Sequence, residues 1–367
     1  MRVRLGDYIK EYSVKNKNNE DIPVYSVSNS LGFCKDYFGK EVASKNKTTY
    51  KIVPRGCFAY NPSRINVGSV DWQNEEERVI VSPLYNVFSV SPLLDQQYLL
   101  YYLKSNVTLS RIRAVASGSV RDNLKLSMLY EFPIDLISLD QQYDVVSTLN
   151  AVQKIIDLYQ KGLSYLDELV RARFVEMFGD LRVNDKGWKY YKLDELTELI
   201  TDGEHATPKR TTQGIYLLSA RNVLNHQLSL EDVDYIDYDE FSRISRRIIP
   251  REGDVLISCS GSIGRCCVVP KNIKFQMVRS IALLRFKSNI NPVFAEYMIT
   301  SDYLQDQINK SKTASSQANL FQGKIKSLKG VVPPLELQNQ FASFVQEIDK
   351  SRLLSNHSLC LIKSITF

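Results

Sequence analysis

The sequence predicts an α+β fold in which two similar, strand-rich globular domains alternate with two long helices that pair as an antiparallel coiled coil. The main observation is an internal repeat: Asn123-Leu124 recurs 196 residues later as Asn319-Leu320, and Ile52–Gly56 is matched by Ile248–Gly253. After each Asn-Leu pair the chain enters a heptad pattern of apolar residues, which is typical of a coiled-coil helix. Two similar modules on one spacer suit a protein that reads a target in two parts.

The expected segments follow changes in composition along the chain. Glycine and proline are frequent in the globular stretches, whereas residues 140–178 contain no proline and only Gly162. The expected segments are a first globular domain over 1–139, a first helix over 140–180, a second globular domain over 181–334 and a short second helix over 335–367.

The first globular domain carries strand and helix signals in turn. Short alternating runs at Val24–Ser28 and Arg78–Val81 predict strands. Leu93–Lys104 spaces its apolar residues as an amphipathic helix does.

The first long helix has apolar residues at alternating steps of four and three. They are Val145, Leu149, Val152, Ile156, Tyr159, Leu163, Leu166, Val170 and Met177. Only Arg173 interrupts the series. At 1.5 Å per residue the helix would be about 58 Å long. This regular spacing favours a coiled coil over the alternative, a long helix that lies across its own domain.

The second globular domain follows turn residues at Gly179-Asp180 and Asn184–Gly187. Its expected elements are strands at 214–218, 254–258 and 280–286 and one helix over 292–308.

In the second long helix Leu337, Phe341, Phe344 and Ile348 are in register, and the pattern then loosens at Ser351 and Ser355. The two heptad helices can pack antiparallel, and each would then bury an apolar stripe.

Composition bounds the function without fixing it. Hydrophobic residues make up 44% and charged residues 24% of the 367 residues, as in a globular protein with real cores. The net charge of +6 permits a polyanionic partner. Met1–Asp7 lacks an apolar signal region, and no run of 18 apolar residues occurs. We therefore expect a cytoplasmic protein with no membrane span.

Cysteine and histidine usage argues against a metal site. The six cysteines include no C-x-x-C pair, and His205, His226 and His357 lie far apart in sequence. Unpaired thiols in a reducing cytoplasm explain this pattern better than a structural zinc site does. No metal ligands are therefore assigned.

Catalytic motifs are missing as well. The stretch nearest to a P-loop, Gly261–Arg265, lacks both its length and its lysine. No glycine-rich cofactor fingerprint, no H-E-x-x-H and no G-x-S-x-G is present. The sequence thus predicts no catalytic residues and no cofactor in this chain.

Polar loops at matching places in the two halves are the candidate binding residues. Arginine, asparagine, glutamine, serine and threonine are the side chains that reach phosphates and base edges of DNA. The candidates in the first half are Asn61, Arg64, Asn66, Ser119, Arg121 and Asn123. Those in the second half are His205, Thr207, Lys209, Arg210, Arg221, Ser260, Ser262, Arg265, Gln317 and Asn319. For any one loop, an ordinary solvated turn is the alternative.

Three stretches give the chain a resemblance to the specificity subunit of type I restriction-modification systems. Met177–Asp180 through Gly187-Trp188 to Leu193 is similar to the family's junction between its first helix and second recognition domain. Asp202–Pro208 is similar to its D-G-x-H-x-T-P loop, and Val332–Gln340 to its P-P-L-x-x-Q entry into the second helix.

The resemblance implies a non-catalytic subunit in which each globular domain recognises one half of a bipartite site in double-stranded DNA. Modification subunits that bind S-adenosylmethionine and methylate adenine are implied to dock on the paired helices. Restriction subunits are implied to add cleavage driven by ATP and Mg²⁺. The apolar residues that mark the docking helices are Leu149, Ile156, Leu163, Leu166, Phe341, Phe344 and Ile348.

The chain departs from the family pattern in three places. Asp21–Val24 stands where the first domain would carry a D-G-x-H-x-T-P loop. The first helix is entered through Ser138–Gln142 after the single Pro133, and the second helix stops at Phe367. Two other functions stay open at this point. A coiled-coil scaffold whose domains bind protein predicts little salt-dependent DNA affinity, and an enzyme with an unrecognised site predicts activity from the isolated chain.

Overall fold

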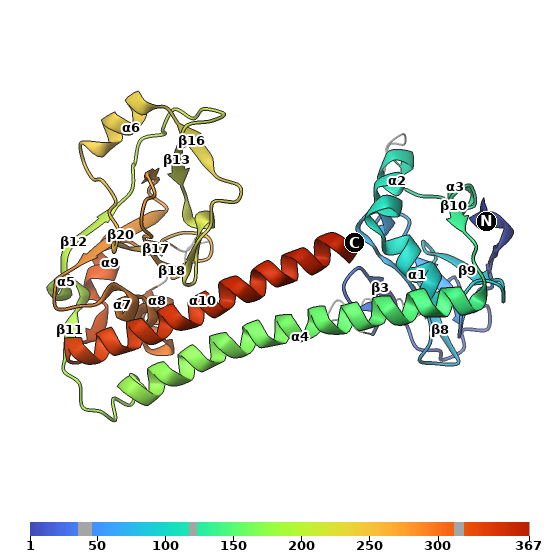
Figure 1. Ribbon diagram of the computed structural model, residues 1–367, viewed down its shortest axis with the longest axis horizontal. Coiled ribbons are helices and arrows are strands. Elements are labelled where there is room, and N and C mark those ends of the chain that lie inside the picture. The colour runs from blue at the N-terminus through green and yellow to red at the C-terminus, as the bar shows by residue number, and fades with distance from the viewer. Residues whose placement is uncertain (36–45, 117–122, 312–318, 367) are drawn as a thin grey trace. The chain divides into compact units, whose positions relative to one another are not determined.

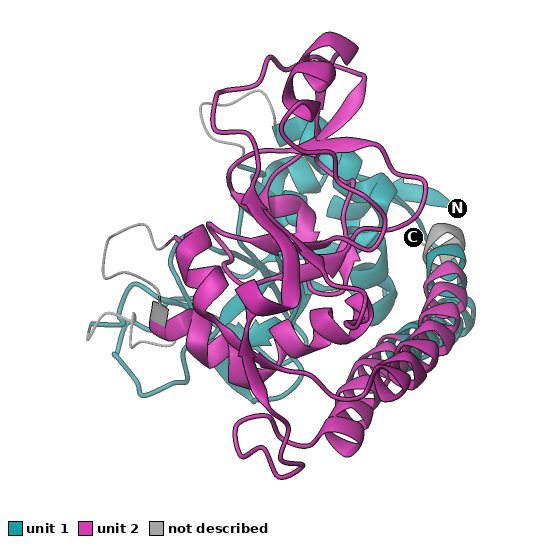
Figure 2. Cartoon of the chain, turned by 90° about the vertical axis from the view of Figure 1, so that its left-hand side faces the viewer, with its two compact units in different colours: residues 1–159, 358–367 teal, residues 160–357 magenta. Residues whose placement is uncertain are grey.

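The computed structural model describes residues 1–35, 46–116, 123–311 and 319–366, and it divides into two compact units. Unit 1 contains residues 1–159 and 358–367, and unit 2 contains residues 160–357 (Figure 2). The long helix α4 (Leu139–Phe178) and the C-terminal helix α10 (Leu335–Thr366) each contribute to both units. Each unit is described by itself below.

Unit 1 is built on a four-stranded antiparallel sheet with the order β2-β9-β6-β7. Its strands are β1 (Arg2–Arg4), β2 (Ile9–Glu11), β3 (Ser26–Ser28), β4 (Gly32–Cys34), β5 (Lys51–Pro54), β6 (Phe58–Tyr60), β7 (Val70–Trp72), β8 (Arg78–Val81), β9 (Asn86–Val90) and β10 (Pro133–Asp135). Its helices besides α4 are η1 (Leu5–Asp7), η2 (Ile65–Val67), α1 (Gln96–Lys104), α2 (Asn106–Ala116) and α3 (Leu126–Leu129). Phe58, Tyr60 and Phe88 fill the core between this sheet and the helices.

Unit 2 has a four-stranded antiparallel sheet, β12-β20-β17-β18, and a mixed three-stranded sheet, β16-β13-β19. Its strands are β11 (Tyr190–Lys192), β12 (Thr197–Asp202), β13 (Ile215–Leu218), β14 (Val223–Leu224), β15 (Gln227–Leu228), β16 (Asp234–Ile236), β17 (Val255–Ser258), β18 (Cys266–Val268), β19 (Phe275–Met277), β20 (Ile281–Phe286) and β21 (Lys329–Val331). Its helices besides the long ones are α5 (Leu193–Leu196), η3 (Ala220–Asn222), α6 (Tyr238–Ser245), α7 (Pro292–Thr300), α8 (Asp302–Ser311) and α9 (Gln322–Ser327).

The internal repeat seen in the sequence is a repeat of structure. In each unit the first strand pairs antiparallel with the last, β1 with β10 and β11 with β21. The sheet order β2-β9-β6-β7 is matched by β12-β20-β17-β18. Each sheet is followed by two consecutive helices, a short third helix, the last strand and a long helix. The predicted α+β fold with two similar strand-rich domains and two long helices is confirmed.

A buried glutamine makes the same hydrogen bonds at the start of both long helices. The Oε1 of Gln142 accepts from the N–H of Asp95 at 2.8 Å, and its Nε2 donates to the carbonyls of Leu93 and Ile137. The Oε1 of Gln338 accepts from the N–H of Asn291 at 2.8 Å, and its Nε2 donates to the carbonyls of Asn289 and Pro333.

Asp95 and Asn291 are themselves the N-cap residues of α1 and α7, and each accepts a backbone N–H of its helix through its side chain. Both glutamines are fully buried. The first turn of each long helix is therefore fixed to the start of the first helix that follows its own sheet.

Within unit 2, α4 and α10 run antiparallel (Figure 1). Aromatic side chains pack between them. Phe341 of α10 lies 5.4 Å from Phe174 and 5.5 Å from Phe178 of α4, between ring centroids. Nearer the middle of the pair, the guanidinium of Arg352 on α10 donates to Asp167 on α4 at 2.6 Å. Residues early in one helix thus meet residues late in the other, as the expected antiparallel arrangement requires.

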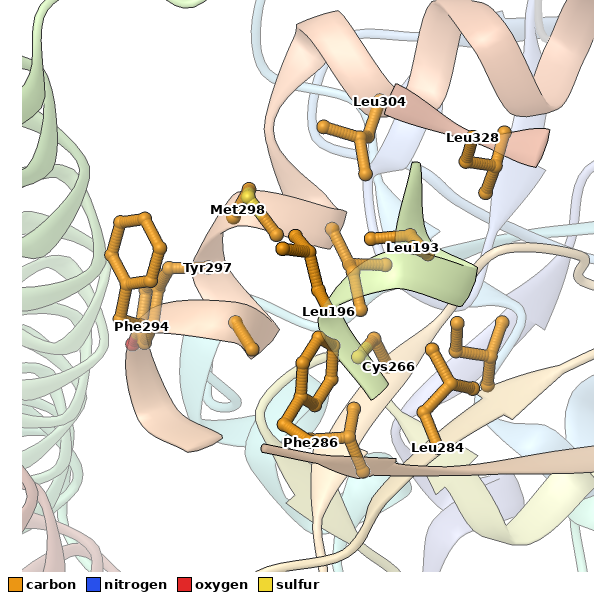
Figure 3. Packing of buried hydrophobic residues seen from close by; sticks show 14 of the residues in the cluster. Leu193, Leu196, Cys266, Leu284, Phe286, Phe294, Tyr297, Met298, Leu304 and Leu328 are labelled. Atoms are coloured by element: carbon orange, nitrogen blue, oxygen red, sulfur yellow. The ribbon is translucent and has the colours of Figure 1, made fainter. Parts of the chain in front are cut away.

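The helix pair joins the core of unit 2 through α7. Phe294 of α7 stacks on Phe174 of α4 at 5.9 Å between ring centroids, and Tyr297 lies edge-on to Phe341 of α10 at 5.2 Å. Figure 3 shows Phe294, Tyr297 and Met298 in this core with Leu193 and Leu196 of α5. Because these large aromatic side chains are buried against one another, they fix the globular part of unit 2 on α4 and α10.

One expectation about helices was wrong. The single helix expected over 292–308 is broken at Ser301, whose extended backbone (ψ 151°) ends α7 and whose Oγ donates to the carbonyl of Met298. The second long helix, expected over 335–367, is α10, and the loosening of its apolar pattern at Ser351 and Ser355 does not interrupt it. The ion pair of Arg352 with Asp167 occupies the seam where apolar residues are lacking.

Replacing Phe341 by Ala should destabilise the protein by about 3–5 kcal/mol, because a fully buried ring that contacts both α4 and α7 is removed. The free energy of unfolding from urea titration measures this loss. Leu354→Ala on the same helix is the control, since that side chain is 72% exposed and its loss should change stability by less than about 0.5 kcal/mol. Equal effects of the two changes would contradict the packing described.

Replacing Gln338 by Ala should cost about 1–3 kcal/mol, because the N–H of Asn291 would be left buried without its acceptor. Urea titration again provides the measurement. Gln340→Ala is the matched control, since Gln340 is exposed on the same turn of the helix. If the Gln338→Ala variant were as stable as the Gln340→Ala variant, the proposed structural role of Gln338 would be wrong.

Candidate nucleic-acid interface

Three of the predicted binding residues meet in one cavity of unit 2. His205, Ser260 and Asn319 come from three separate loops and line a cavity of about 860 Å³. The other lining residues are Asp202, Cys259, Gly261, Arg279, Ser280, Leu320 and Phe321. Most of this lining is polar, and the ring of Phe321 is 60% exposed.

Backbone hydrogen bonds fix the loop that carries Asp202 and His205. The N–H of Gly203 donates to the carbonyl of Ile281 at 3.0 Å, and the N–H of Glu204 donates to that of Met277 at 2.8 Å. A Cβ on Gly203 would lie 2.4 Å from the carbonyl oxygens of Met277 and Val278, so this approach requires glycine. The loop Asp202–Pro208 therefore lies directly against the segment that contains Arg279.

The loop after β17 is closed by the Asn-Leu pair of the repeat. Ser260 and Asn319 form an isolated antiparallel bridge, and the N–H of Leu320 donates to the carbonyl of Cys259 at 2.9 Å. The Oγ of Ser258 also donates to the carbonyl of Ser262 at 2.6 Å. These bonds place Ser260 and Asn319 side by side at the cavity.

The ionisable side chains that line the cavity include Asp202, His205 and Arg279. Burial raises the pKa of Asp202 above its ordinary value, while His205 and Arg247 partly oppose this shift. His205 Nε2 lies 3.7 Å from a carboxylate oxygen of Asp202. The exposed Arg279 takes part in none of the ion pairs found among the described residues.

Lys209, Arg210 and Arg221 do not line this cavity. Arg210 and Arg221 share the carboxylate of Asp234 on β16, each with one contact of 3.1 Å. The backbone N–H of Lys209 donates to Glu240 at 3.1 Å. None of these three basic residues therefore belongs to the cavity, and two of them, Arg210 and Arg221, form a separate cluster with Asp234.

Thr207, Ser262 and Arg265 also lie outside the cavity lining, although they belong to the loops that form it. Thr207 and Ser262 are exposed, and Arg265 is half-buried with its backbone N–H bonded to the Oγ of Ser258.

Unit 1 brings its predicted residues together at the equivalent place. The Oγ of Ser63 donates to the side-chain oxygen of Asn123 at 2.5 Å, and the N–H of Leu124 donates to the carbonyl of Pro62. Asn61 and Asn66 are half-buried and Arg64 is exposed in the loop that follows β6. Ser119, Arg121 and Gln317 lie outside the described residues.

The long helices expose apolar residues other than the predicted ones. Phe341 and Ile156 are buried, and Leu149, Leu163, Leu166, Phe344 and Ile348 are half-buried. On α4 a second series, spaced by three, seven and four residues, is exposed. It consists of Ile155, Leu158, Tyr165 and Leu169.

Sequence reasoning missed Asp202, Arg279 and Phe321 as cavity residues. Asp202 and Phe321 could have been found, because Asp202 is the first residue of the loop that resembles D-G-x-H-x-T-P and Phe321 directly follows the Asn-Leu pair. No pattern marks Arg279, which reaches the cavity only through the pairing of its segment with Glu204.

The described residues hold no group of three or more His, Cys, Asp or Glu side chains that could bind a metal ion. The six cysteines are all unpaired. Among the described helices, none combines the length and the apolar character that a membrane crossing requires.

Comparisons with known proteins agree on one family. The family model described as the type I restriction modification DNA specificity domain matches residues 4–166 and 185–363. Over 170 residues the chain is 25% identical to a protein of Methanocaldococcus jannaschii named as the type I restriction enzyme MjaX specificity subunit, an alignment that covers 44% of this chain and 39% of that protein.

Over 288 residues it is 24% identical to a Haemophilus influenzae protein named as the type I restriction enzyme specificity subunit S.HindORF215P, covering 72% of this chain and 66% of that protein. The aligned parts span less than two thirds of both relatives.

Two solved structures share the fold. A chain from a study of complex assembly and conformational transition of the type I R-M system matches with a TM-score of 0.63 and 15% identity, covering all of this chain and 95% of that one. The S subunit of a Mycoplasma genitalium (M. genitalium) type I restriction-modification system matches with a TM-score of 0.51 and 13% identity, covering all of this chain and 93% of that one.

The Asp202→Asn variant tests the electrostatics of the cavity. Because burial raises the pKa of Asp202, folding disfavours its charged form, and this cost grows as pH rises through the folded-state pKa. The stability of the variant relative to the natural protein should therefore increase as the pH is raised from about 4 to about 7. Urea titrations at the two pH values provide the comparison, and a relative loss of stability on raising the pH would contradict the assignment.

Proposed function

We propose that this chain, which belongs to the type I restriction-modification DNA specificity family, is the subunit that reads the DNA sequence for a type I restriction-modification complex. Each of its two globular parts, over residues 1–139 and 181–334, would read one half of a bipartite site. The chain itself would carry out no chemistry, and it would direct the methylation or cleavage performed by other subunits.

One observation carries the proposal. In both units the loop after the equivalent strand, β6 or β17, meets the Asn-Leu pair of the repeat, and polar side chains gather there. The scaffold is the same, but Asn61–Asn66 and Ser260–Arg265 present different side chains. A shared scaffold with different polar loops is what the reading of two different short sequences requires, because each base pair exposes its own pattern of donors and acceptors.

The charge of the chain supports a nucleic-acid partner. Its net charge of +6 favours contact with phosphates, which supply affinity without sequence information. We expect the two half-sites to lie about one helical turn apart, roughly 10 base pairs, so that both domains meet one face of the duplex.

The family and the exposed helix surface support the proposed partners. Modification subunits that use S-adenosylmethionine would dock on the long helices, where Ile155, Leu158, Tyr165 and Leu169 expose an apolar series. Restriction subunits that use ATP and Mg²⁺ would join the same complex.

A protein-binding scaffold without DNA specificity is the alternative. It leaves unexplained why the polar loops of the two halves differ while the scaffold repeats.

Methylation mapping tests the function. Cells that express the chain with its methyltransferase partner should contain methylated adenine within one bipartite sequence motif, and cells that lack only this chain should not. Long-read sequencing of genomic DNA detects the modified base. Identical methylation patterns with and without the chain would reject the proposal.

Asn319→Ala tests the modular reading. Asn319 lines the cavity of unit 2, so its loss should relax the motif in one half-site and leave the other half-site unchanged. The relaxed position should lose about 1–3 kcal/mol of discrimination if Asn319 pairs bidentately with adenine. The same loss of specificity in both half-sites would show that the domains do not read independently.

A further inference from the structure

We infer that the cavity of unit 2 reads a G·C base pair, with Arg279 facing the guanine and Asp202 facing the cytosine. This inference rests on the proposed function and assigns a base pair to one half-site. It draws on two charged residues that line the same cavity and that were not among the sequence-based candidates.

Arg279 has the position and the availability that guanine recognition needs. Its backbone N–H donates to the carbonyl of Glu204 at 3.0 Å, which fixes its position beside the loop that holds Asp202. Its side chain takes part in none of the ion pairs formed by the described residues, whereas Arg210, Arg221 and Arg243 are all paired with carboxylates. A guanidinium can donate two parallel hydrogen bonds to N7 and O6 of guanine.

Asp202 supplies the complementary acceptor. Its side chain is 22% exposed at the cavity, and Nε2 of His205 lies 3.7 Å from one of its carboxylate oxygens. A carboxylate in this state gains from a hydrogen-bond donor, since burial has removed part of its hydration. The exocyclic amino group of cytosine is such a donor in the major groove.

Together, Arg279 and Asp202 can discriminate between base pairs, which the rest of the cavity lining cannot do as sharply. Ser260, Ser280 and Asn319 can each donate and accept hydrogen bonds, so they fit several base edges. An ionised aspartate only accepts and an arginine only donates. Two acceptors on guanine beside a donor on cytosine match this pair, whereas an A·T pair offers a different arrangement of donor and acceptor groups.

Methylation mapping of variants in the intact complex tests the inference. Arg279→Ala and Asp202→Asn should each make one G·C position of one half-site degenerate, with discrimination reduced roughly 5- to 150-fold, and leave the other half-site unchanged. Arg246→Ala is the matched control, because Arg246 is exposed in the same unit but does not line the cavity. The Arg246→Ala variant should methylate the same sequence motif as the natural protein, and any decrease in methylation should be equal at all genomic copies of that motif.

Arg279→Lys guards against a variant that fails to fold. Lysine keeps the positive charge but loses the planar fork, so methylation should persist while the G·C position becomes degenerate. A motif that stays unchanged in the Arg279 and Asp202 variants overturns the inference, as does a uniform loss of methylation at every position in the Arg279→Lys variant. If the natural protein itself yields no bipartite motif, the proposed function fails and the inference fails with it.

Discussion

The buried amide of Gln338, with its counterpart in Gln142, is the interaction that the rest of each unit depends on. Three hydrogen bonds connect the first turn of a long helix to the segment before it and to the start of α1 or α7. If one of these polar groups were left without a hydrogen bond in the apolar core, it would lower the free energy of unfolding by about 1 to several kcal/mol. A sheet, its two helices and its long helix therefore fold as one module, and the chain contains this module twice.

A module fixed in this way leaves its polar loops free to differ. The bonds that position the cavity of unit 2 run through backbone atoms of Gly203, Glu204, Cys259 and Leu320. Most of the side chains at the cavity can therefore change without breaking the scaffold. The same place in unit 1 is closed by an equivalent backbone bond from the N–H of Leu124 to the carbonyl of Pro62, and there the side chains of Ser63 and Asn123 meet. The proposed recognition of two different half-sites depends on this division between a constant backbone and variable side chains.

The sequence predicted the repeat, the long helices and several loop residues, because each leaves a periodic or local signal. It did not predict Phe174 and Phe178, which lie outside the heptad series and face α7 and Phe341. Nor did it predict the hydrogen bond of Arg352 on α10 to Asp167 on α4, because these two residues are far apart in the chain. The role of Arg279 depends on pairing between distant segments, and short-range patterns carry no information about such pairing.

Hydroxyl-radical footprinting of the assembled complex on DNA that contains its methylation motif tests the central claim most directly. Two modules that each read one half-site should protect two short patches, separated by a spacer that stays accessible, with centres roughly 10 base pairs apart. The variant Asn319→Ala should weaken one patch and leave the other intact. A single continuous protected region, weakened throughout by that variant, would contradict the account of two independent readers.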